Sequence, residues 1–193
     1  HSPHERLDTH ARRVGFRSAV LTGVVNAAPL HATVDTADAG AGSADEPQVS
    51  PRTERIGVTI NGRELDARVA RWTPLDHVLP RVSAAQLRTR VEEHRDAGVG
   101  VLHVDGVGVY ESSEFYEICD ELGMLVVQDP PFVGAGYRAG APVQGEAIEE
   151  TREHVARLAP HPALLTYGTV EDRSYGSLVS GIIAMLDPDR LTT

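Results

Sequence analysis

The feature that most constrains the fold of this chain is an alternation of short apolar runs with helix-like segments through its second half. Apolar runs of strand length occur at 99–104, 124–129 and 163–168. Apolar residues at helical spacing occur in four segments, at 83–98, 112–123, 145–159 and 174–186. Strands that alternate with helices predict βαβ units and a parallel sheet. Because the runs are continuously apolar, we expect both faces of that sheet to be buried.

Local signals support these assignments. Ser83 and Gln86 have the spacing of a helix capping box, and Gly98 follows the same helix. A further strand near 66–72 brings the count to about four β/α units. A closed (β/α)8 barrel needs eight units and roughly 250 residues. The alternation alone therefore fits both a half barrel and a small open sheet.

The N-terminal third has a different pattern, with β character at 12–21 and 56–65. Asn61-Gly62 lies inside the second of these segments, and Asn-Gly is the strongest two-residue signal for a β-hairpin. Residues 31–54 are rich in Ala, Asp, Gly, Ser and Pro, which predicts a surface loop or flexible insertion.

Charge and composition exclude several classes of partner. The chain carries 18 basic and 28 acidic residues, a net charge of −10, so it lacks the basic excess that would neutralise nucleic-acid phosphates. No apolar run approaches the ~20 residues that span a bilayer, so we expect no membrane interaction. Cys119 is the single cysteine, which excludes an internal disulfide and fits a reducing, cytoplasmic location.

Several longer stretches carry a family resemblance. They are LDTHARRVGFRS at 7–18, INGRELDARVARWTPLDHVLPRV at 60–82, DAGVGVLHVDGVGVYESSEFYEICDELGMLVVQD at 96–129, HVARLAPHPALLTYGTVED at 154–172 and LDPDR at 186–190. In this order and spacing they resemble the β-mannosidases of glycoside hydrolase family 2.

The resemblance implies an α/β fold, a partial (β/α)8 TIM-type barrel preceded by a short β-sandwich-derived segment. In this interpretation residues 1–65 are the tail of a β-sandwich domain, with the insertion 31–54 and a hairpin into the barrel. Residues 66–193 are the first half of the glycosidase barrel.

The resemblance also implies a catalytic role for Glu171, as the acid/base of a retaining glycosidase that hydrolyses terminal β-mannosides. Such enzymes use two carboxyl groups about 5–5.5 Å apart, one as acid/base and one as nucleophile. The family's nucleophile follows a later barrel strand that has no counterpart in this chain. Taken without the resemblance, Glu171 is more simply a solvated loop residue.

A set of residues is expected to line the sugar subsite: Trp72, Asp76, His103, Asp105 and Asp129. Here the chain departs from the family, because His103 replaces an Arg, Asp105 replaces a Trp and Val170 replaces an Asn. Each lost hydrogen bond to a sugar hydroxyl typically costs ~1–3 kcal/mol. The alternative function is therefore a catalytically impaired module that binds carbohydrate or a partner chain.

These residue types also suggest metal binding and core packing. His103, Asp105, Asp129 and Glu171 could gather at one barrel end, but no metal-binding spacing occurs and the resemblance implies no metal or organic cofactor. Trp72 and Tyr110 could stack on a sugar ring or pack in the core. A half barrel exposes sheet edges, so we expect a homo-oligomer or a missing barrel half as partner.

Overall fold

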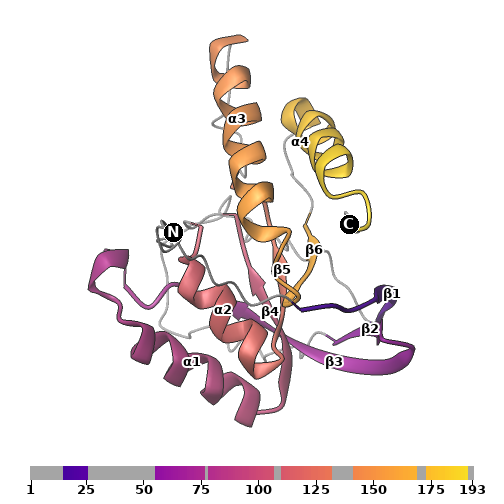
Figure 1. Cartoon of the computed structure of the whole chain (residues 1–193), viewed down its shortest axis with the longest axis vertical. Helices are drawn as coiled ribbons and strands as arrows, with labels where there is room; N and C mark the ends of the chain where they lie inside the picture. Colours follow the sequence, from indigo (N-terminus) through magenta and orange to yellow (C-terminus); the bar gives the residue numbers. More distant parts are fainter. Residues whose placement is uncertain are drawn as a thin grey trace, which may run out of the picture.

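The computed structural model describes residues 15–25, 55–76, 78–106, 110–131, 141–168 and 173–190. Six strands form one sheet in the order of the sequence (Figure 1). The strands are β1 (Ala19–Val25), β2 (Arg55–Ile60), β3 (Arg63–Trp72), β4 (Val99–Val104), β5 (Leu125–Gln128) and β6 (Leu164–Tyr167). The helices are α1 (Ala84–Asp96), α2 (Ser113–Leu122), α3 (Ala141–Leu158) and α4 (Arg173–Leu186), with a short 3-10 helix at Leu79–Arg81.

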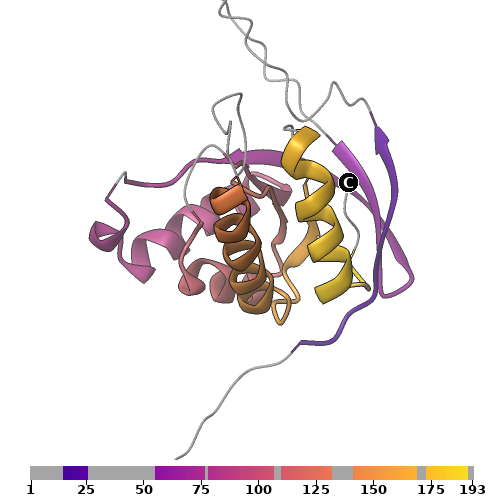
Figure 2. The same cartoon turned by 90° about the horizontal axis from the view of Figure 1, so that it is seen from above.

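The sheet has an antiparallel part and a parallel part. β1, β2 and β3 pair antiparallel, whereas β3, β4, β5 and β6 pair parallel to one another. A helix follows each of the four parallel strands, which confirms the predicted β/α units and the partial barrel. α1 packs beside α2 and α3 beside α4 (Figure 1), and the view from above also shows α3 next to α4 (Figure 2).

The predicted hairpin lies where the sequence places it. Ile60 pairs with Arg63, which leaves Asn61 and Gly62 as a two-residue turn with φ angles of 52° and 76°. Both angles are positive, as a type I′ turn requires, and Asn-Gly is the pair that adopts them most readily. β3 continues from this hairpin across the proposed boundary between residues 65 and 66, so the division into two domains stays a prediction.

The helix ends also follow the sequence signals. The Ser83 backbone N–H donates to Gln86 Oε1 at 2.9 Å, and the Gln86 N–H donates to Ser83 Oγ at 3.3 Å, which confirms the capping box. Gly98 and Gly123, with φ angles of 78° and 70°, follow α1 and α2 in the left-handed conformation that suits glycine.

Both faces of the sheet are buried, in two separate cores. On the outer face, residues such as Leu102, Val104 and Val126 pack against the helices, among them Phe115 of α2 and Leu158 of α3. The inner face carries a smaller cluster: Ile56, Val58, Ala67, Val101, Val127 and Leu165. Ile56 and Val58 come from β2, so the hairpin contributes to the same inner cluster as the parallel strands.

A buried turn joins α3 to β6. Asp120 of α2 accepts hydrogen bonds from His161 Nδ1 at 2.6 Å and from the Ala163 backbone N–H at 2.7 Å. His161 and Pro162 therefore lie in the helix-to-strand turn, at the amino ends of the parallel strands. No helix within the described ranges has the length and apolar character needed to cross a membrane.

Candidate active site

The candidate site lies at the carboxyl ends of the parallel strands, the end at which TIM-type barrels carry their chemistry. Strand register places Arg71, His103, Val127 and Thr166 side by side across β3, β4, β5 and β6. Because side chains alternate between faces, this row shares the inner face with Val101. A one-residue bulge in β6 makes the row possible, since both Leu165 and Thr166 lie opposite Val127.

His103 and Asp129 form the central polar contact of the inner face. His103 Nε2 and Asp129 Oδ2 are 2.8 Å apart, and the two residues are 4% and 0% exposed. The Asp129 backbone N–H donates to the Val104 carbonyl at 2.9 Å, which extends the β4–β5 contact past the end of β5. Burial makes this contact strong, because a buried carboxylate is costly without a hydrogen-bonding partner.

Gly168 is required beside this pair. A Cβ atom at position 168 would lie 1.7 Å from Asp129 Oδ1, a distance that no real side chain tolerates. The Gly168 backbone N–H also donates to the Gln128 carbonyl at 2.9 Å. The absence of a side chain at Gly168 therefore leaves the space that the Asp129 carboxylate occupies.

A second set of contacts supports Asp129 from the outer face. Tyr116 of α2 donates its hydroxyl to Gln128 Oε1 at 2.5 Å, and Gln128 Nε2 donates to the Asp129 carbonyl at 2.9 Å. Burial raises the pKa of the Tyr116 hydroxyl, which keeps it protonated and able to donate. Asp129 is thus held through its backbone as well as through its carboxylate.

Trp72 lies on the outer face, one residue beyond the inward-facing Arg71. It is 2% exposed, and its ring centroid lies 4.7 Å from that of Phe115. Its indole N–H donates to Glu111 Oε1 at 2.8 Å. Its position on the outer face, packed against the helices, favours the core-packing alternative for Trp72 over direct contact with a sugar.

Glu111 is a buried carboxyl group in the loop between β4 and α2. Burial raises its pKa, while the hydrogen bond from Trp72 opposes that shift. Arg157 of α3 donates to the Glu111 backbone carbonyl at 2.9 Å, and its guanidinium lies 5.3 Å from the centre of the Tyr116 ring. Glu111 and Arg157 were not predicted from the sequence. The stretches at 96–129 and 154–172 that carry the resemblance contain Glu111 and Arg157, and they are the signal that could have pointed to them.

The remaining predicted residues have varied surroundings. Asp105 forms an ion pair with Arg71 at the inner rim, with side chains 17% and 68% exposed. Asp76 accepts a hydrogen bond from the Val78 backbone N–H at 2.8 Å and stabilises the loop after β3. The Tyr110 ring lies against His154 of α3, on the helix side of the sheet.

The structure therefore brings some of the predicted residues together and separates others. His103, Asp105 and Asp129 share the inner face or its rim, whereas Trp72 lies behind the strand. Glu171 lies outside the described residues, so its placement stays a prediction. Within the described part of the chain, no group of three or more His, Cys, Asp or Glu residues could hold a metal ion.

Four consecutive β/α units with an inward-facing polar pair at the carboxyl end are the arrangement of a partial TIM-type barrel, and the comparisons show which proteins it resembles. The β-mannosidase of Bos taurus is 39% identical over 108 residues, which are 56% of this chain and 12% of that protein. β-Mannosidase B of Aspergillus terreus is 37% identical over 115 residues, which are 58% of this chain and 14% of that protein.

A solved structure gives the same result. The crystal structure of β-D-mannosidase from Dictyoglomus thermophilum superposes with a TM-score of 0.64 and 28% identity, over 72% of this chain and 20% of that chain. No family model matches the chain. The chain is thus partially homologous to β-mannosidases of glycoside hydrolase family 2, which confirms the resemblance, and it matches a small part of their length.

Proposed function

We propose that this chain is part of the catalytic region of a retaining glycoside hydrolase that acts on terminal β-mannosides. The observation that carries the proposal is the match of a partial barrel to proteins named β-mannosidase, in both sequence and structure. The His103–Asp129 pair supports it, since it lies at the end of the parallel strands where barrel enzymes bind substrate.

In this proposal Glu171 is the acid/base. It would protonate the glycosidic oxygen as the bond to the anomeric carbon breaks, and later take a proton from the attacking water. The nucleophile that forms the glycosyl-enzyme intermediate would come from the part of the barrel that this chain does not include. The chain therefore supplies half of the catalytic pair.

His103 and Asp129 would bind the sugar. A fixed imidazole and carboxylate on the inner face can hydrogen-bond adjacent hydroxyl groups, and their burial keeps their geometry constant while substrate binds. Asp105 and Asp76 would lie at the rim, and Arg71 would orient Asp105. Trp72 would act from behind the strand, by holding Glu111 and the loop after β4.

The alternative function is a module that binds carbohydrate or a partner without catalysing hydrolysis. It is favoured by His103 and Val170, which stand where the family has an Arg and an Asn. An isopropyl group has no hydrogen-bond donor, so Val170 cannot replace the amide.

A binding experiment tests whether His103 and Asp129 form a sugar site or have a purely structural role. We expect a non-hydrolysable thio-β-mannoside to shift the NMR resonances of the His103 ring in the 193-residue chain, and the α-anomer to cause a smaller shift. Asp129→Asn should abolish the shift, whereas Arg152→Ala on the exposed side of α3 should leave it unchanged. Equal responses to both anomers, or none to either, would contradict a β-mannoside site.

Hydrolysis separates the two functions. We expect the 193-residue chain to leave a chromogenic β-mannoside intact, because it lacks the second carboxylate. Turnover that Glu171→Gln abolishes would show that the chain is active by itself. The same substrate should be cleaved once the missing barrel half is supplied, and its failure there would favour the binding module.

We also propose a cytoplasmic location. The support is the single Cys119, which is buried on α2 and whose pKa is raised by that burial, as expected of a packing residue that is not needed for a disulfide. Cell fractionation with the tagged chain tests this.

A further inference from the structure

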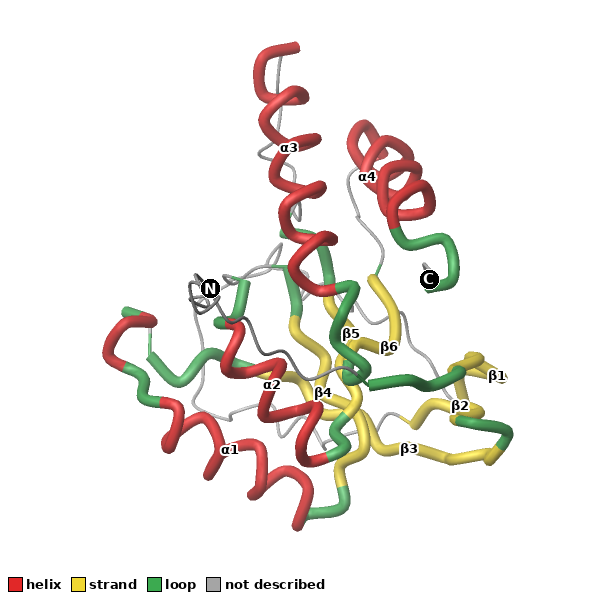
Figure 3. Tube along the Cα trace, in the orientation of Figure 1, coloured by secondary structure: helices red, strands yellow, loops and turns green. Residues whose placement is uncertain are grey.

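A buried tyrosine lies behind the polar pair of the inner face. Tyr116 is fully buried in α2, and α2 lies against β5 on the outer face of the sheet (Figure 3). The centroid of the Phe115 ring is 5.1 Å from that of Tyr116, and the Arg157 guanidinium lies 5.3 Å from the centre of the Tyr116 ring. Because its ring is on the helix side of the sheet, Tyr116 can influence a sugar on the inner face only through other residues.

The Tyr116 hydroxyl begins a chain of hydrogen bonds whose direction is fixed. A backbone carbonyl only accepts, so the Gln128 side chain must turn its amide nitrogen toward the Asp129 carbonyl, 2.9 Å away. Gln128 Oε1 therefore faces Tyr116, and the Tyr116 hydroxyl must donate to it, since an amide oxygen also only accepts. Burial raises the pKa of this hydroxyl, so it keeps the proton that it donates.

The chain fixes the backbone of Asp129 from both sides. The Asp129 N–H donates to the Val104 carbonyl at 2.9 Å, and the Asp129 carbonyl accepts from Gln128 Nε2. These two fixed peptide groups set the direction of the Asp129 Cα–Cβ bond, and with it the carboxylate that lies 2.8 Å from His103 Nε2. The chain therefore crosses the sheet, from a helix on the outer face to the polar pair on the inner face.

Burial makes each link of the chain hard to replace. Gln128 is 2% exposed, so bulk water cannot substitute for a lost hydrogen bond to its side chain. Without the Tyr116 hydroxyl, Gln128 Oε1 would be a buried acceptor that has lost this donor. The amide would then be free to rotate away from the Asp129 carbonyl.

We propose that Tyr116 is a positioning residue of the sugar site, which fixes the Asp129 carboxylate and the His103 ring from the opposite face of the sheet. The proposal rests on the function proposed above, because it takes this pair as the group that binds sugar hydroxyls. Tyr116 acts through Gln128 and the Asp129 backbone. Arg157 supports the same arrangement, since its guanidinium covers the Tyr116 ring.

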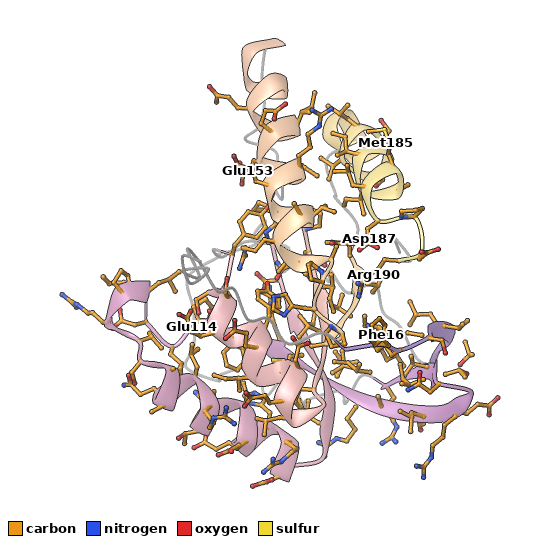
Figure 4. The ribbon with its side chains drawn as sticks, in the orientation of Figure 1. Phe16, Glu114, Glu153, Met185, Asp187 and Arg190 are labelled. Carbon is orange, nitrogen blue, oxygen red and sulfur yellow. The ribbon has the colours of Figure 1, made fainter. Side chains whose placement is uncertain are left out.

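The first test needs no sugar. Tyr116→Phe removes only the hydroxyl and should shift the NMR resonances of the His103 ring in the ligand-free chain. Tyr167→Phe is the matched control, since Tyr167 is also buried and lies opposite Gln128 in the strand register. The Tyr167 hydroxyl reaches Asp187 Oδ2 at 3.5 Å, and Figure 4 shows Asp187 below α4. Equal shifts in the two variants, or none in Tyr116→Phe, would overturn the proposal.

A double-mutant cycle tests whether Gln128 transmits the effect. Gln128→Met keeps the length of the side chain but removes both of its hydrogen bonds. It should shift the His103 resonances by itself, and Tyr116→Phe should add no further shift in that background, because the two residues act in series. Additive shifts would reject the chain. Either single variant still tests the proposal if the other does not fold, because each breaks the chain at a different atom.

The last test measures affinity for the thio-β-mannoside, corrected for the unfolded fraction of each variant. Tyr116→Phe should bind about fivefold more weakly than wild type, as expected for the loss of one buried hydrogen bond. Tyr167→Phe should keep the wild-type affinity. Wild-type affinity in Tyr116→Phe would overturn the proposal. If the wild-type chain does not bind the thio-β-mannoside, the proposed function fails, and the ligand-free resonances alone decide whether Tyr116 positions His103 and Asp129.

Discussion

The two ends of the parallel strands are held by different kinds of contact. At the amino ends, Asp120, Arg17 and Arg190 bond mainly to backbone groups of the turn before β6 and of β6 itself. At the carboxyl ends, buried side chains bond to each other, as in His103–Asp129 and Trp72–Glu111. Backbone contacts fix the path of the chain whatever the neighbouring side chains are. Side-chain pairs fix particular functional groups, so the carboxyl end is where a substitution should alter binding.

The largest expected effect is that of Gly168→Ala at the carboxyl end. The new methyl group would overlap Asp129 Oδ1, which a Cβ approaches to 1.7 Å, so the carboxylate must leave His103. We expect a loss of about 3 kcal/mol in the free energy of unfolding, at the upper end for overpacking. Urea denaturation measures it, and thio-β-mannoside binding should fall in the same variant. Wild-type stability would show that a methyl group at position 168 fits beside Asp129 Oδ1.

Asp120→Ala at the amino end should cost about 2 kcal/mol, because His161 and the Ala163 N–H lose a charged acceptor. Asp120→Asn is the matched control and should cost less, since its amide oxygen still accepts one hydrogen bond. Thio-β-mannoside affinity, corrected for the unfolded fraction, should not change. A change in affinity would show that contacts at the amino ends of the strands also affect binding.

His154 should make stability depend on pH. Burial, and secondarily Arg157, lower its pKa from about 6.5 to about 2, so the folded chain resists protonation that the unfolded chain accepts. The stabilisation of the folded chain by neutral His154 is complete above pH ~6.5 and is lost progressively as the pH falls toward 2. About 1–2 kcal/mol of it is lost between pH 7 and 5. His154→Gln should flatten this part of the stability curve, as measured by urea denaturation at each pH. Parallel curves for the two proteins would contradict the assignment.

Arg71→Ala should have the smallest effect on stability, about 0.5 kcal/mol or less, because its side chain is 68% exposed where it meets Asp105. Its effect on thio-β-mannoside binding should be larger than its effect on stability, since it orients Asp105 at the rim. Arg88→Ala, which removes a partner of Glu121 on the outer helices, is the control. It should leave the affinity for the thio-β-mannoside unchanged and should alter stability by about 0.5 kcal/mol or less. If Arg71→Ala and Arg88→Ala changed the affinity equally, Arg71 at the rim would have no special role in binding.

The fold could be predicted where the determining residues are close in sequence. Asn61-Gly62 defines its own turn, and Ser83 and Gln86 complete a capping box within one helical turn. The face of the sheet on which each side chain lies was harder to predict, because it depends on where each strand begins and on its bulges. Trp72 therefore lies behind β3, although the resemblance suggested the subsite. The contact between Arg17 and Leu164 spans 147 positions of sequence and leaves no local pattern.

The bulge at Leu165 has a consequence for how this chain can change. Since Leu165 and Thr166 both lie opposite Val127, the bulge absorbs one residue and Tyr167 still pairs with Gln128 on the helix side. Deleting Leu165 would leave Leu164, Thr166 and Tyr167 opposite Val126, Val127 and Gln128 in regular alternation, so Tyr167 would keep its direction while the inner cluster would lose one side chain. An inherited deletion of one codon should therefore change the direction of the β6 side chains less at the bulge than at Leu164 or Tyr167.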